Sequence, residues 1–96
     1  MPIRSFANKP TEEFFFTGKP GGRIGWKDVT AVARRKLDML HFAASLNDLK
    51  SPPGNRLETL KGNLQGLHSI RINDKWRVVF RWSDAGTDEA RVVDYH

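Results

Sequence analysis

Two arginines flank a predicted turn in the second half of the chain, Arg71 before it and Arg77 after it. If the flanking segments pair as a hairpin, two directly opposed arginines repel each other unless an anion lies between them. Phosphate suits this pair, because a guanidinium presents a planar, permanently charged fork of donors to phosphate oxygens. Such donors also stabilise the additional negative charge of a phosphorane-like transition state. The alternative is that Arg71, Arg77 and Arg81 only solvate an exposed face, with Asp94 as an acidic partner.

The register of this hairpin decides which side chains share a face. A two-residue turn at positions 74 and 75 would mix charged and apolar side chains on both faces of the sheet. A three-residue loop of Asn73, Asp74 and Lys75 places Arg71 opposite Arg77 and separates the two kinds of residue. One face then carries Ile70, Ile72, Trp76, Val78, Phe80 and Trp82. We expect the other to display Ser69, Arg71, Arg77, Val79 and Arg81, with Arg77 exposed to solvent.

The elements that hold the hairpin are indicated by periodicity and by glycine and proline. Residues 3–6 alternate as a short first strand does, and Pro10 with Gly18 predicts a short helix between them. Residues 18–25 contain four glycines and one proline, which predicts a loop. Apolar residues recur every three or four positions over 26–49, which predicts one long amphipathic helix, ended by Pro52 and Pro53.

The strands are predicted over residues 69–72, 76–82 and 90–95, after both helices. A chain of 96 residues and 11.0 kDa is long enough for one compact core and too short for two. We therefore predict one α+β domain over residues 1–96, with two N-terminal helices packed on a small antiparallel sheet.

The charge and composition narrow the partners and the chemistry. Sixteen Lys and Arg against eleven Asp and Glu give a net charge of +5, which favours polyanions, although the same charge also keeps a small domain in solution. The absence of cysteine excludes disulfides, thiolate zinc sites and cysteine nucleophiles. The three histidines are scattered without ligand spacing, so we expect no metal or other cofactor. No apolar run approaches the ~20 residues of a membrane span, and we expect a cytoplasmic protein with no membrane partner.

Three sequence blocks together carry a family resemblance: Leu60-Lys61-Gly62, residues 69–80 (SIRINDKWRVVF), and the ending Val93-Asp94-Tyr95-His96. They resemble the HigB branch of the RelE/ParE toxins. The resemblance implies a RelE-like fold and a ribonuclease that enters the ribosomal A site. Such a toxin cleaves messenger RNA without metal, by attack of a ribose 2′-hydroxyl on its adjacent phosphate. It also implies a partner, an antitoxin of the HigA type with a helix-turn-helix domain.

The resemblance carries over to particular residues of this chain. The matched functional positions are Lys61, Arg77, Asp94, Tyr95 and His96. Other HigB-like proteins can carry a His where this chain has Glu58, and an Arg near the hairpin turn where it has Asn73. Tyr95 either stacks on a base or hydrogen-bonds the reacting groups.

The remaining roles follow from side-chain chemistry, and the general base stays open between two residues. Glu58 or His96 can accept the 2′-hydroxyl proton near neutral pH, and His96 is also a candidate proton donor to the leaving 5′-oxygen. Arg77 and Arg71 would hold the scissile phosphate, with Lys61 adding positive charge. Against this, Glu58 and Lys61 are also compatible with ordinary loop residues, and the last two residues with a frayed chain end.

Two other functions are compatible with the same features. ParE-like toxins share this architecture and inhibit DNA gyrase instead of cutting RNA. A non-catalytic RNA-binding module would need only the basic charge and exposed aromatic residues. The opposed arginines and the terminal Tyr-His favour the nuclease.

Overall fold

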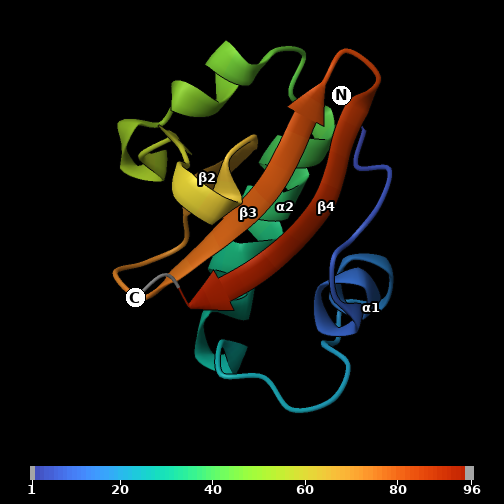
Figure 1. Cartoon of the computed structure of the whole chain (residues 1–96). Helices are drawn as coiled ribbons and strands as arrows, with labels where there is room; N and C mark the ends of the chain where they lie inside the picture. Colours follow the sequence, from blue (N-terminus) through green and yellow to red (C-terminus); the bar gives the residue numbers. More distant parts are fainter. Residues whose placement is uncertain (1, 95–96) are drawn as a thin grey trace.

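The computed structural model describes residues 2–94, which form two α-helices and a four-stranded antiparallel sheet. Helix α1 (Lys9–Thr17) and helix α2 (Thr30–Phe42) precede strands β1 (Glu58–Thr59), β2 (Leu67–Arg71), β3 (Trp76–Ser83) and β4 (Gly86–Asp94). The strands lie side by side in the order β1-β2-β3-β4. Helix α2 crosses behind the sheet, and α1 lies beside β4 (Figure 1). The predicted α+β class is confirmed.

Helix α1 begins and ends where the sequence predicts. The Asn8 side chain accepts a hydrogen bond from the backbone N–H of Thr11 at 3.1 Å, and Pro10 occupies the first turn, where no backbone donor is needed. Gly18 ends the helix at φ 82°, a left-handed conformation that favours glycine, and its N–H donates to the Phe14 carbonyl at 2.8 Å.

The single long helix predicted over residues 26–49 is wrong. The structure divides this segment into a 3₁₀ turn η1 (Lys27–Val29), helix α2, and a second 3₁₀ turn η2 (Leu46–Lys50). The backbone leaves the helical region at Ala43, at ψ 135°, and Ser45 with Asp48 forms a capping box that begins η2. The apolar residues after the break nevertheless contribute to the core, since Leu49 is buried.

The hairpin of β2 and β3 has the predicted register. Arg71 is the Cα partner of Arg77, and Ile70 is the partner of Val78. The Asn73 side chain closes the loop by accepting from the backbone N–H groups of Lys75 at 2.9 Å and Trp76 at 2.8 Å. The three-residue loop is therefore confirmed, and the charge-separation argument that selected it is sound.

The last strand is longer than predicted, because it begins at Gly86 and not at position 90. A β-bulge between the partners of Val79 and Arg81 shifts its register, and Glu89 lies there at φ 56°, a left-handed conformation unusual for a residue with a side chain. The bulge allows Ala90 to remain buried in the core while Glu89 stays exposed.

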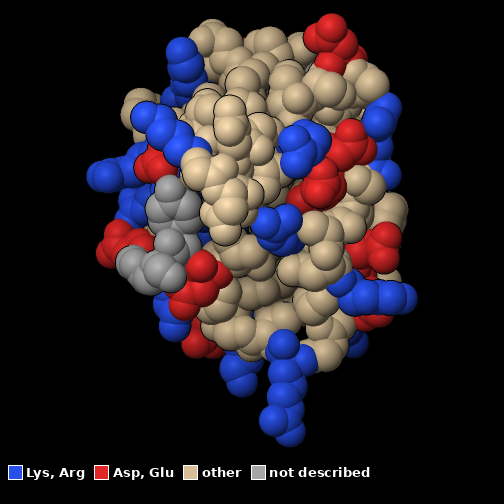
Figure 2. Space-filling model, in the orientation of Figure 1, with Lys and Arg blue, Asp and Glu red and all other residues tan. Residues whose placement is uncertain are grey.

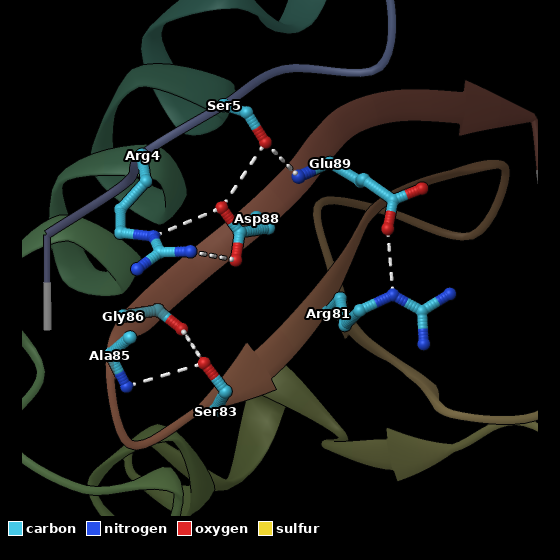
Figure 3. Close-up of polar contacts among 8 residues, drawn as sticks. All are labelled: Arg4, Ser5, Arg81, Ser83, Ala85, Gly86, Asp88 and Glu89. Atoms are coloured by element: carbon cyan, nitrogen blue, oxygen red, sulfur yellow. Dashed lines mark hydrogen bonds and ion pairs between the residues drawn. The ribbon is translucent and has the colours of Figure 1, made fainter.

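The N-terminal segment does not form the first strand predicted over residues 3–6. It makes two isolated parallel bridges to β4, and its side chains bind the bulge (Figure 3). Arg4 donates two hydrogen bonds to the Asp88 carboxylate, at 3.1 and 3.2 Å. Ser5 accepts from the Glu89 N–H at 2.9 Å and donates to Asp88 at 3.3 Å. These side-chain contacts add to backbone hydrogen bonds between residues 2–7 and β4, such as that from the Arg4 N–H to the Thr87 carbonyl at 2.7 Å.

The face of the sheet toward the helices carries the main core. Ile70, Val78, Phe80, Ala90 and Val92 pack there against Phe14, Ala33, Leu37 and Leu40 of the two helices. No helix within residues 2–94 is long and apolar enough to cross a membrane.

The opposite face is not the exposed arginine surface that the sequence predicts. A second apolar cluster of Leu60, Leu67 and Val79, with Val93 against it, covers part of this face. Figure 2 looks onto this side and shows basic and acidic side chains mixed around a centre of other residues. Of the three arginines on this face, Arg77 is buried, Arg71 is partly exposed and Arg81 is exposed.

Candidate functional site

Arg77 lies at the centre of the candidate site and is only 6% exposed. Its Nε donates to the Ser69 Oγ of the neighbouring strand at 2.8 Å, and its Nη2 donates to the backbone carbonyl of Arg56 at 2.5 Å. The expectation of a solvent-exposed Arg77 is wrong, because the segment before β1 lies against this part of the sheet. A buried guanidinium held at two of its nitrogens has a fixed orientation, as a residue that stabilises developing charge requires.

Glu58 places a carboxylate beside this buried cation. It is the Cα partner of Ser69 on β2, and its Oε1 lies 4.0 Å from Nη1 of Arg77. The Glu58 side chain is 47% exposed, whereas that of Arg77 is 7% exposed. An incoming molecule can therefore reach the Glu58 carboxylate, and the Arg77 cation orients this carboxylate. Both properties suit a proton acceptor.

Arg71 stands next to Arg77 in the sheet but its side chain points to the turn. Its guanidinium forms an ion pair with Asp74, three residues further along the chain. Arg81, the third predicted arginine, pairs with Glu89 at 2.6 Å. Acidic groups of the chain itself therefore face all three arginines, and the opposed pair does not require a bound anion for stability.

Lys61 lies in the connection from β1 to β2, just after the strand that carries Glu58. It is exposed and immediately precedes the short 3₁₀ turn η4 (Gly62–Leu64). The N–H of Gln65, the residue after this turn, donates to the Gly62 carbonyl at 3.1 Å. An exposed cation thus follows the half-exposed carboxylate of Glu58 closely along the chain.

Asp94 is not brought to this face by the strand register. It is the partner of Trp76, and successive side chains of a strand point to opposite faces, so Asp94 lies on the side of Trp76 and not on that of Arg77. Its carboxylate lies 3.8 Å from Nζ of Lys75, across the hairpin end. Tyr95 and His96, the other two predicted residues at this end, lie outside the described residues.

Two contacts of the site were not predicted from the sequence. The predicted register already placed Ser69 on the face of Arg77, two residue pairs away along the hairpin, so its hydroxyl could have been named as a partner. The Arg56 carbonyl has no such signal. It reaches Arg77 because Arg56 adopts a left-handed conformation, φ 46° and ψ 56°, which sequence patterns do not reveal for an arginine.

One histidine of the sheet has a shifted pKa but lies away from the site. Burial lowers the pKa of the His68 imidazole below its ordinary value of 6.5. His68 pairs with Thr59 and shares the helix-side face of β2 with Ile70. Within residues 2–94, no group of three or more His, Asp or Glu side chains is arranged to hold a metal ion.

Comparison with known proteins decides the family. A family model described as a RelE-like toxin of the type II toxin–antitoxin system HigB matches residues 4–96. The chain belongs to this HigB-like toxin family. A curated relative, Toxin HigB-1 of Vibrio cholerae, is 40% identical over 79 residues, which cover 82% of this chain and 82% of the relative. The resemblance noted in the sequence blocks is confirmed.

Several solved structures share the fold of this HigB-like chain. A chain of a YoeB–YefM complex from Staphylococcus aureus matches with a TM-score of 0.61 and 23% identity, over 100% of this chain and 97% of the other. A YoeB/ParE toxin from Agrobacterium tumefaciens matches with a TM-score of 0.56 and 22% identity, over 100% of both chains. At these identities the likeness concerns the architecture alone.

Proposed function

We propose that this HigB-like toxin is a ribosome-dependent endoribonuclease that cleaves messenger RNA in the ribosomal A site and so inhibits translation. The observation that carries the proposal is the buried Arg77 fixed beside the half-exposed Glu58, with exposed Lys61 just after the strand of Glu58. Membership in the HigB-like family supports it. A fixed cation beside a reachable carboxylate meets the two requirements of phosphodiester cleavage, charge stabilisation and proton transfer.

In the proposed reaction the ribose 2′-oxygen attacks the adjacent phosphorus and the bond to the 5′-oxygen breaks, leaving a 2′,3′-cyclic phosphate. Glu58 or His96 takes the proton of the 2′-hydroxyl, and a protonated group returns one to the 5′-oxygen. Arg77 stabilises the charge on the non-bridging oxygens, and Lys61 adds a second cation. Arg71 would leave Asp74 to contribute, since an exposed ion pair is weak.

The end of the chain has a proposed part in the same reaction. Tyr95 would stack on a base of the message or hydrogen-bond the reacting groups. Asp94 lies on the other face of the sheet, so we assign it an indirect role. Its ion pair with Lys75 joins the end of β4 to the hairpin loop.

We propose that the cleavage step needs no metal, because arginine and lysine supply the positive charge and side chains supply the proton transfer. The ribosome would orient the message in the A site, so that the toxin is active on translated messages and poor on free RNA. This substrate places the proposed activity in the cytoplasm.

We also propose that the natural protein partner is an antitoxin of the HigA type. The family is that of type II toxin–antitoxin systems, and a solved structure with the same fold is a YoeB–YefM toxin–antitoxin heterotetramer. The helix-turn-helix domain of the antitoxin is an expectation from the resemblance to HigB toxins.

Primer-extension mapping in a reconstituted translation system tests the function. The expected result is cleavage within codons of translated messages, with 2′,3′-cyclic phosphate ends, and little cleavage of the same RNA without ribosomes. Robust cutting of free RNA that EDTA abolishes would contradict the proposed mechanism. Intact messages together with inhibited DNA supercoiling by gyrase would instead support a ParE-like activity.

A further inference from the structure

A lysine and an asparagine form a buried polar pair between α2 and the segment that follows it. Lys36 of α2 is 9% exposed and Asn55 is 0% exposed, and Nζ of Lys36 donates to Oδ1 of Asn55 at 2.5 Å. Burial, and then the positive charges of Arg35 and Arg71, lower the pKa of the Lys36 ammonium below its ordinary value. An apolar side chain would fill this position at lower cost, so the pair calls for an explanation other than packing.

The Asn55 amide connects two backbone carbonyls to the Lys36 side chain. Its Nδ2 donates to the carbonyl of Leu49 at 3.1 Å and to that of Ser51 at 3.3 Å, while its Oδ1 accepts from Lys36. The amide therefore ties helix α2 to η2 and to the turn η3 (Pro53–Asn55). Because every polar atom of this side chain has a partner, its position is tightly determined.

The next residue, Arg56, links the turn that Asn55 fixes to the candidate site. Its backbone is in the left-handed region, which is costly for a residue with a Cβ atom and persists only where surrounding contacts hold it. Its N–H donates to the Pro53 carbonyl at 3.1 Å, and its own carbonyl accepts from Nη2 of Arg77 at 2.5 Å. Glu58, which faces Arg77, follows only two residues later.

We propose that Lys36 and Asn55 are positioning residues for Arg77. Lys36 orients the Asn55 amide, Asn55 fixes the turn that holds Arg56 in its left-handed conformation, and the Arg56 carbonyl with Glu58 then fixes the guanidinium of Arg77. A helix on the far side of the sheet thus controls the orientation of the group that stabilises charge. The role of this orientation in catalysis rests on the proposed nuclease function, whereas the positioning itself does not.

The test is the substitution Lys36→Met, which keeps the length and apolar character of the side chain and removes only the donor. Hydrogen exchange at Nε–H of Arg77, measured by NMR on the purified chain, should become at least tenfold faster. On ribosomes, kcat for cleavage should fall at least tenfold with KM little changed, since substrate binding surfaces are untouched. Lys36→Arg, which retains a charged donor, should restore exchange toward the wild-type rate.

Two matched variants separate positioning from ordinary destabilisation. Lys50→Met makes the same change at an exposed lysine and should leave Arg77 exchange unchanged. Val32→Ala weakens the packing of α2 one turn before Lys36 but keeps both members of the Lys36–Asn55 pair, and it should lower Tm without accelerating Arg77 exchange beyond twofold. If Val32→Ala with a similar loss of Tm accelerates exchange as much as Lys36→Met does, the positioning role is overturned.

A second substitution keeps the test decisive if Lys36→Met does not fold. Asn55→Asp preserves the shape and the acceptor for Lys36 but removes the two donors to Leu49 and Ser51, and it should also accelerate Arg77 exchange at least tenfold. Wild-type exchange in this folded variant would overturn the proposal. Failure of the wild-type protein to cleave messages would contradict the nuclease function alone, because the NMR measurement does not depend on cleavage.

Discussion

Arg71 and Arg77 are directly opposed on neighbouring strands, yet their guanidinium groups face different carboxylates. Arg71 pairs with Asp74 in the hairpin loop, and Arg77 lies 4.0 Å from Glu58 on the edge strand. The repulsion expected for opposed arginines is thus offset by two carboxylates of the same chain. Of the two, only Arg77 is buried, so it combines a structural role with the proposed catalytic one, and substitutions at the two positions should have different consequences.

Arg77→Ala should abolish cleavage and also destabilise the fold. The substitution leaves the buried hydroxyl of Ser69 and the carbonyl of Arg56 without this donor, which costs about 2–4 kcal/mol of unfolding free energy. Loss of the charge-stabilising group should lower the cleavage rate by about 100-fold or more. Urea denaturation and primer extension on ribosomes, at a temperature where the variant is folded, measure the two effects.

Arg81→Ala is the matched control for this prediction. Arg81 is exposed and pairs with Glu89 on the surface, so its removal should change stability by no more than about 1 kcal/mol. Its cleavage rate should stay close to that of the wild type. Equal stability of the two variants would show that the buried contacts of Arg77 contribute nothing.

Lys61→Met should reduce cleavage by roughly tenfold without a loss of stability. The side chain is exposed, so its truncation should change the unfolding free energy by less than about 0.5 kcal/mol. Its charge acts through water on the phosphate and is weaker than that of a buried donor. Lys50→Met removes one exposed positive charge elsewhere, and an equal loss of activity in that variant would indicate a general charge effect.

The hairpin and its register followed from the sequence because one rule governs them. Alternation of side chains fixes which residues share a face, and only the three-residue loop separates charge from core. Helix α1 followed for a similar reason, since Asn8, Pro10 and Gly18 are local signals for its two ends.

The burial of Arg77 could not be predicted in this way. It depends on the segments before and after the two-residue strand β1, which have little regular structure. Their course is set by the left-handed Arg56 before the strand and by the packing of Leu60 with Val79 after it. The break after α2 was predictable in part, because Ser45 and Asp48 have the spacing of a capping box, but the continued apolar periodicity concealed it.

The stability of the fold should decrease in acid through His68. Its folded-state pKa lies below 6.5, so the unfolded chain binds the proton more tightly and protonation favours unfolding. The contribution is fully present above pH 6.5 and is lost as the pH falls below that value. His68→Gln retains a polar partner for the Thr59 hydroxyl, 3.1 Å away, and should flatten this part of the stability profile. Urea denaturation at a series of pH values measures it, and an unchanged slope would exclude His68 as the cause.

The general base should be identified by Glu58→Gln compared with His96→Gln. The carboxylate of Glu58 is half-exposed beside Arg77, so replacing it with an amide of the same shape removes a proton acceptor and leaves the backbone pairing with Ser69 intact. If Glu58 is the base, the glutamine variant should lose about 100-fold in kcat, and the acid limb of its pH–rate profile should disappear.

A chain lacking Tyr95 and His96 should remain folded and bind its antitoxin, because the core residues are untouched, and we expect it to lose cleavage through the missing proton donor. Full activity of Glu58→Gln together with loss of the acid limb in His96→Gln would transfer the base to the last residue, and full activity of the truncated chain would leave Glu58 and Lys61 as the acid–base pair.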